Sequence, residues 1–224
     1  LEDIKFFVLL TKMYYPYTPL KASHYHGGGD TISEVFSYLK GLKVPCLVIL
    51  DSDIKYPGCE MGNTARRCLA RCKKKMGHIE VKMLDVHEAE NLLPIEFLRE
   101  VASKRGLALL DLLGNKEMLD KLKYLDIKEG IKKEDVENNE GYMSFCEEIY
   151  NELYKKKNNT FAKYMAQKRN GYDYLFVQIG SALLDKFNKK NNLAYHDDVM
   201  TPYRRQIAEL VKTFICCRGY DPIN

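Results

Sequence analysis

Two carboxylates that directly follow an apolar run are the residues of this chain best suited to do chemistry. Asp51 and Asp53 stand two positions apart after residues 44–50, whose aliphatic and β-branched side chains predict a strand buried on both faces. Ligands of open α/β sheets bind beyond the carboxyl ends of the strands, which is where both aspartates are expected. Close carboxylates repel each other unless a cation lies between them, so the pair predicts a Mg²⁺ or Mn²⁺ site. The alternative is that one aspartate caps a following helix or turn.

A basic stretch follows the two aspartates. Arg66, Arg67 and Lys73 fall within one predicted helix, over residues 61–76, and are candidates for contacting nucleic-acid phosphates. A solvated helix face is the default explanation for such a run. The net charge of +4 tolerates a nucleic-acid partner but does not by itself indicate one.

An acidic block lies after the next predicted strand. Glu88 and Glu90 are expected at the same edge of the sheet as the aspartates, where either could add a carboxylate to the site. His87 beside them is the best candidate for a general acid or a further ligand. The alternative for Glu90 and Asn91 is a packing role, in which one of them caps the start of a helix.

The elements that must position these residues alternate between helices and strands. Apolar periodicity and breakers predict a helix from residue 1 to about 13, a strand over 21–26, a helix over 31–42, a strand over 44–50, the basic helix and a strand over 78–84. This alternation predicts a parallel sheet with right-handed crossovers and flanking helices.

The strand signals fade after Pro94. Residues 94–105 and 107–113 are expected to be helical, residues 126–141 are charged and loop-like, and helical periodicity returns in three later segments, around Phe145 to Tyr154, Leu175 to Phe187, and Ile207 to Phe214. We therefore divide the chain into an α/β domain, residues 1–105, and an α-helical C-terminal appendage, residues 106–224.

Composition limits the class of protein. The 224 residues are 46% hydrophobic and 29% charged, as in ordinary globular proteins. No apolar stretch reaches the roughly 20 residues that a membrane span needs, so no membrane partner is expected. The seven cysteines are an odd number without paired metal-type spacing. Reduced thiols and a cytoplasmic location are the expectation.

Three local motifs make the chain resemble a known family. Residues 1–7 (LEDIKFF) look like the second half of an E-G-x-x-D-x-x-F-F motif, residues 87–94 (HEAENLLP) resemble an (R/H)-E-(I/A)-E-N-L-L-P block, and residues 124–131 (YLDIKEGI) look like a D-x-K-x-G-I segment. Together with the strand order, they resemble the Toprim domain of the OLD-family and PtuA-like defence ATPases, to which a further group of uncharacterised domains is related.

The resemblance implies a Toprim-like fold and a nuclease that depends on Mg²⁺ or Mn²⁺. It implies that Asp51, Asp53 and Glu88 bind metal and that Asp51, Asp53 and Glu90 are catalytic. It also implies a nucleic-acid substrate (DNA rather than RNA), a role in anti-phage defence, an ATPase domain upstream in the same protein and assembly as a homo-oligomer. The aligned family glutamate would precede Leu1. The alternative is a catalytically degenerate Toprim scaffold whose helical part docks a partner effector such as a separate nuclease.

Overall fold

The computed structural model describes residues 2–18, 32–42, 45–72, 78–112, 118, 120–154, 160–167 and 174–217. The predicted strand over residues 21–26 and the predicted phosphate contact Lys73 lie outside these residues. The elements of the first half are α1 (Glu2–Tyr14), α2 (Ile32–Leu42), β1 (Cys46–Leu50), α3 (Asn63–Cys72), β2 (Ile79–Met83), the 3₁₀ helix η2 (Ala89–Leu92), α4 (Ile95–Val101) and α5 (Lys104–Leu112). Those of the second half are the 3₁₀ helix η3 (Asp120–Tyr124), β3 (Gly130–Lys132), α7 (Lys133–Glu137), α8 (Glu140–Leu153), α9 (Phe161–Ala166), β4 (Tyr174–Val177), α10 (Leu183–Asn188) and α11 (Thr201–Cys217).

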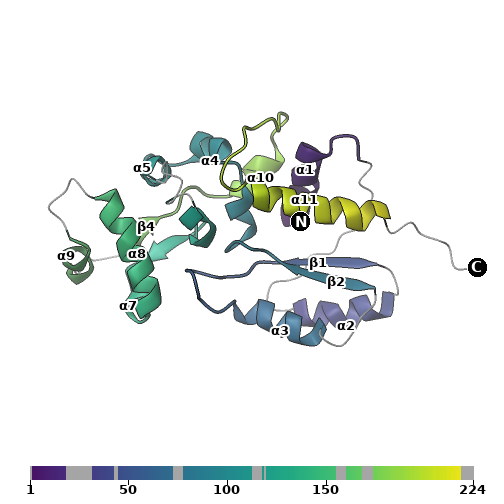
Figure 1. The fold of residues 1–224 in the computed structure, drawn as a ribbon, viewed down its shortest axis with the longest axis horizontal. Helices are drawn as coiled ribbons and strands as arrows, with labels where there is room; N and C mark the ends of the chain where they lie inside the picture. Colours follow the sequence, from purple (N-terminus) through teal and green to yellow (C-terminus); the bar gives the residue numbers. More distant parts are fainter. Residues whose placement is uncertain are drawn as a thin grey trace, which may run out of the picture.

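The strand that precedes Asp51 forms a parallel pair, as its apolar sequence predicts. β1 pairs with β2 in a register that places Val48 opposite Val81 and Leu50 opposite Met83. Figure 1 shows this pair between α2 and α3 on one side and α1 and α11 on the other. Val48 and Leu50 join a small core with α2 and α3, whereas the alternate residues of β1 contact the main core. The mixed α/β class and the parallel pair are thus confirmed.

The main core joins the two ends of the described chain. Phe6 of α1 packs edge-on against Phe187 of α10, with ring centroids 5.6 Å apart. The same cluster continues through the fully buried Leu92 and Leu93 to Ile207 of α11. Because α1 packs on both α10 and α11 (Figure 1), the start of the chain is held next to its last helices. This packing holds Asp3, in the first turn of α1, close enough to Asp51 after β1 for its charge to affect the pKa of Asp51.

Two sequence predictions for the second half are wrong. The region 126–141 is not a loop, because it contains β3, α7 and the start of α8. The periodicity from Leu175 to Phe187 is not one helix, because Tyr174–Val177 forms β4, which pairs antiparallel with β3. The described second half is therefore not purely helical. Strands of three and four residues are too short for an alternating pattern to be visible, and their pairing joins residues far apart in sequence.

The turn into β3 depends on glycine, and alanine there is expected to destabilise the protein. Gly130 has φ +83°, and a Cβ on it would lie 2.6 Å from the carbonyl oxygen of Phe176 in β4. We expect Gly130→Ala to lower the free energy of unfolding by about 1–3 kcal/mol in urea titrations. Gly41→Ala in α2 is the control, because nothing lies within 4 Å of the added carbon. Equal stability of both variants would contradict the role of Gly130.

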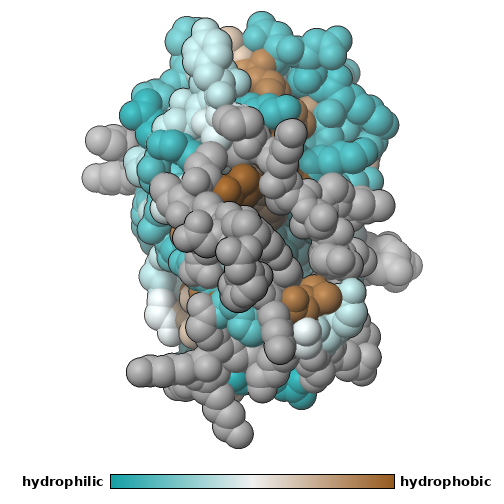
Figure 2. Space-filling model, turned by 90° about the vertical axis from the view of Figure 1, so that its right-hand side faces the viewer, coloured by the Kyte–Doolittle hydropathy of each residue, from teal (hydrophilic) through white to brown (hydrophobic). Residues whose placement is uncertain are grey.

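Among the described residues, none of the helices is long and apolar enough to cross a membrane. On the face shown in Figure 2, hydrophilic residues predominate among those coloured, and hydrophobic surface is confined to small, separate areas.

Candidate functional site

Asp51 lies at the carboxyl end of β1 and is tied to the segment that follows β2. Its Oδ1 accepts a hydrogen bond from the backbone N–H of Ala89 at 2.9 Å. Two more bonds align the same segments: the Ser52 hydroxyl donates to the carbonyl of Val86 (2.7 Å), and the N–H of Asp53 donates to the carbonyl of His87 (3.0 Å). The chain beyond β2 is thereby fixed against the aspartate loop, which brings the acidic block to Asp51.

Asn91 holds Glu88 and Glu90 in place. Its side-chain oxygen accepts from the N–H of Glu88 at 2.9 Å, and its amide donates to the carbonyls of Leu122 and Leu125 at 2.7 and 2.8 Å. The predicted alternative of a capping role is thus correct for Asn91, which belongs to a reciprocal capping arrangement at the start of η2. Leu92 and Leu93 anchor the block in the main core. Both glutamates are buried as a result.

A lysine from a distant segment faces both glutamates. The Nζ atom of Lys128 lies 3.6 Å from Oε2 of Glu88 and 3.7 Å from Oε1 of Glu90. Asp126 shapes this segment, since its Oδ1 accepts from the N–H of Glu129 at 2.7 Å. Sequence reasoning gave Lys128 and Asp126 no role in the site. The one signal that could have found them was the D-x-K-x-G-I resemblance.

Burial and the neighbouring charges raise the pKa values of these carboxylates. Burial, followed by the charge on Glu90, raises the pKa of Asp51 to about 7. Burial and then the charges of Glu90 and Asp126 raise the pKa of Glu88 to about 8. Burial also raises the pKa of Glu90, although Lys128 opposes this shift. The ammonium of Lys128 therefore compensates only part of the negative charge.

Asp3, in the first turn of α1, is a further member that the sequence analysis did not assign. Its charge contributes to the raised pKa of both Asp51 and Glu90. Asp3 is exposed, and the packing of α1 on α10 and α11 holds it close enough for its charge to act on the site. The signal in the sequence was the aspartate of the E-G-x-x-D-x-x-F-F resemblance. We refer to Asp3, Asp51, Glu88, Glu90 and Asp126 as the acidic cluster.

Asp53 is oriented differently from Asp51. Its backbone has φ 54°, in the left-handed region, and a Cβ on Gly62 would overlap the Asp53 carboxylate. The side chain therefore packs against Gly62, at the entry to α3, and its charge is the weakest of those that raise the pKa of Asp51. The structure thus brings together Asp51, Glu88 and Glu90 of the predicted site and turns Asp53 toward α3.

The predicted phosphate contacts Arg66 and Arg67 lie on α3, and His87 directly precedes the acidic block. Arg66 and Arg67 are exposed on α3, where Arg66 pairs with Glu60 at 2.8 Å and Arg67 contacts the carbonyl of Asn63 at 3.4 Å. His87 is buried, and this burial lowers its pKa despite the nearby charges of Asp126 and Asp53. Its Nδ1 has no hydrogen-bond partner in the part of the chain that the structure describes.

The cluster fits a hard divalent cation by its chemistry. All its donors are carboxylate oxygens, the type that Mg²⁺ and Mn²⁺ prefer, and buried Oε1 of Glu88 lacks a hydrogen-bond partner among the described groups. A cation would also compensate the charges that, after burial, raise the pKa values of Asp51 and Glu88. In the present arrangement, no three His, Cys, Asp or Glu side chains of the described residues converge as a metal-binding group. The donors would have to close by side-chain rotation.

The raised pKa values predict a loss of stability in alkaline solution when no cation is bound. Asp51 and Glu88 titrate near 7 and 8 when folded, compared with about 4 in an unfolded chain. Between these values the folded state binds more protons, so stability falls as the pH rises from about 5 to about 8. Thermal unfolding in EDTA at several pH values measures this loss of stability. We expect Glu88→Gln to raise the melting temperature at pH 8 but hardly at pH 5; an equal effect at both would contradict the pKa assignment.

Comparison of the chain with protein-family models, curated protein sequences and solved structures finds no match.

Proposed function

We propose that this chain is the Toprim-like part of a nuclease that uses Mg²⁺ or Mn²⁺ to hydrolyse phosphodiester bonds of nucleic acid, DNA rather than RNA. One observation carries the proposal: separate segments deliver Asp3, Asp51, Glu88 and Glu90 to the carboxyl ends of two parallel strands, where they repel one another. Such a concentration of charge is costly unless it holds a cation. The resemblance to OLD-family proteins points to the same site and to a role in phage defence within a homo-oligomeric ATPase.

The residues of the chain have distinct roles on this proposal. Asp51, Glu88 and Glu90 would hold the metal, and the charge of Asp3 would add to the negative potential there. The bound ion would make a water more acidic and neutralise charge on the phosphoryl oxygens. Lys128, which faces the same carboxylates, would donate to a phosphate oxygen once a cation takes over its ion pairs. Arg66, near the start of α3, would contact a phosphate from that side.

A second candidate function is a degenerate Toprim scaffold that docks a partner effector protein. The observation that favours it is the lysine itself. Lys128 already offers a positive charge to Glu88 and Glu90, so the folded protein can tolerate these carboxylates without a metal. On this alternative, residues 106–224 would supply the docking surface.

Cleavage of supercoiled plasmid in Mn²⁺, in Mg²⁺ and in EDTA tests the first candidate. We expect nicking with either metal, none in EDTA, and none from Glu88→Gln/Glu90→Gln with either metal. Glu147→Gln is the matched control, because Glu147 is exposed on α8, outside the acidic cluster. Cleavage by the doubly substituted protein would exclude the acidic cluster as the catalytic metal site. A metal-free, inactive protein that still retains a partner through residues 106–224 would support the scaffold.

A further inference from the structure

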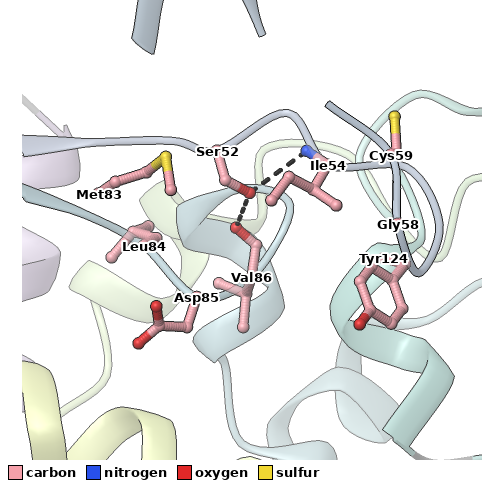
Figure 3. Close-up of a pocket in the computed structure, with 9 residues that line it drawn as sticks. All are labelled: Ser52, Ile54, Gly58, Cys59, Met83, Leu84, Asp85, Val86 and Tyr124. Carbon is pink, nitrogen blue, oxygen red and sulfur yellow. Dashed lines mark hydrogen bonds between the residues drawn. The ribbon is translucent and has the colours of Figure 1, made fainter. Parts of the chain in front are cut away.

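A pocket of about 230 Å³ opens beside the acidic cluster. In Figure 3, Ser52 and Val86 lie at its centre, Met83 on one side, and Tyr124 with Gly58 on the other. It is formed by the loop after β1, the end and continuation of β2, and the last residue of η3. Its surface is divided between apolar side chains, one aromatic ring and a few polar groups.

The polar groups at the centre of the pocket are already bonded within the protein. The Ser52 hydroxyl donates to the carbonyl of Val86 and accepts from the N–H of Ile54 at 3.2 Å, as the dashed lines in Figure 3 show. A ligand must therefore bind mainly through Ile54, the thioether of Met83 and the accessible part of the Tyr124 ring. This ring already lies under the ammonium of Lys123, 5.1 Å from its centroid, and packs edge-to-face with Phe145, so a ligand can use only the part that faces the pocket. The exposed carboxylate of Asp85, whose partner is Lys82 at 2.9 Å, remains the principal hydrogen-bond acceptor. These surfaces suit a flat, largely apolar group that carries an amino substituent.

The pocket and the acidic cluster are built on the same residues of the chain. Ser52 lies between Asp51 and Asp53, and Val86 lies two positions before Glu88. Neighbouring Cα atoms are about 3.8 Å apart, so the backbone segments that carry the two sites lie close together. A phosphate at the cluster would place its own or the adjacent base at the mouth of the pocket.

We infer that this pocket binds one unpaired nucleobase of the substrate, with Tyr124 as the stacking surface and Asp85 as the acceptor for an exocyclic amino group. The inference rests on the proposed function and adds a substrate class to it, namely single-stranded or locally unpaired nucleic acid. Aromatic stacking and a carboxylate that accepts from the cytosine amino group are established ways to bind a base. Thymine has no such amino group and fits less well.

Alkylation of Cys59, which lines the pocket, measures occupancy directly. The full chain is treated with iodoacetamide in Ca²⁺, an ion that carboxylate oxygens bind, and without Mg²⁺ or Mn²⁺, with or without a single-stranded oligo-dC of about 12 nucleotides. With oligo-dC at about ten times its Kd, about a tenth of the sites stay free, so the rate at Cys59 is expected to fall about tenfold. Cys46, at the opposite end of β1, is the internal control. Peptide mass spectrometry follows both thiols.

Variants of Tyr124 and Asp85 test the two contacts by fluorescence anisotropy. Tyr124→Leu is expected to weaken oligo-dC binding about tenfold, whereas Tyr124→Phe retains the ring and the affinity. Oligo-dT is expected to bind more weakly than oligo-dC. The Asp85→Asn substitution is expected to reduce this difference in affinity between the two oligonucleotides. Melting temperatures show that each variant is folded. Equal affinity for the two oligonucleotides would overturn the role of Asp85.

The outcomes separate this inference from the proposed function. An unprotected Cys59 while oligo-dC is bound, or no binding of oligo-dC in Ca²⁺, overturns the base pocket even if plasmid cleavage occurs. Protection of Cys59 in a protein that cleaves nothing with either metal supports the pocket and refutes the nuclease.

Discussion

Asp51→Asn is expected to abolish metal-dependent cleavage and, above pH 7, to stabilise the metal-free protein. A carboxylate that holds the catalytic metal supports several kcal/mol of transition-state stabilisation, so its loss is expected to lower the cleavage rate by about 100-fold or more. The asparagine oxygen can still accept the hydrogen bond from Ala89, which keeps the loop in place. What disappears is the charge that burial and Glu90 disfavour.

The stability effect of this variant has a distinctive pH dependence. Because the pKa of Asp51 is about 7, the wild-type side chain is mostly protonated at pH 5.5 and ionised at pH 8.5. The melting temperature of Asp51→Asn in EDTA is therefore expected to exceed that of the wild type at pH 8.5 and to match it at pH 5.5. Glu147→Gln, which removes an exposed carboxylate from α8, controls for the change in net charge. A wild-type cleavage rate, or a lower stability at pH 8.5, would contradict the assignment.

Arg204→Ala is expected to cause a large loss of stability. Arg204 is 1% exposed in α11, where its Nη2 lies 2.8 Å from both Asp198 and Thr201 and its Nε donates to the hydroxyl of Tyr14 in α1 at 3.0 Å. Asp198 also accepts the N–H of Ile95 at the start of α4 at 2.9 Å. Removing one partner of a buried ion pair costs about 3–5 kcal/mol, because the other charge is left uncompensated. For a chain of this size, the melting temperature is expected to fall by on the order of 10 °C.

The neighbouring arginine provides the control for Arg204. Arg205 pairs with Asp197 at 2.9 Å, but both side chains are largely exposed. Solvent screens such a pair, so Arg205→Ala is expected to change the free energy of unfolding by about 1 kcal/mol or less. Urea titration of both variants measures the difference. If the two losses agree within about 1 kcal/mol, Arg204 does not join α1 to α11 as the contacts indicate.

Local pattern was a good guide where an element is long or strongly apolar. The α1 and α2 helices and the β1 and β2 strands lie within a few residues of their predicted positions. Each has several residues that repeat one period, so the pattern is visible without knowledge of its partners. Local pattern did not predict the short β3 and β4 strands, because each is stabilised by pairing with the other and more than one helix separates them in the sequence. The burial of Arg204 could not be predicted from the sequence either, because it depends on the ion pair with Asp198 and the hydrogen bond to Tyr14, which only the fold brings together.

By itself, the sequence determined the parallel pair and the position of Asp51 at its end, because strand periodicity and the abrupt change to carboxylates are local. It also marked the block with Glu88 and Glu90. Only the tertiary structure decided which charges meet. The fold brings Asp3 and Lys128 to Asp51 through the packing of α1 and the bonds of Asn91, while the left-handed backbone of Asp53 turns its carboxylate toward Gly62. Charge interactions depend on distance and burial, and neither is a property of spacing along the chain.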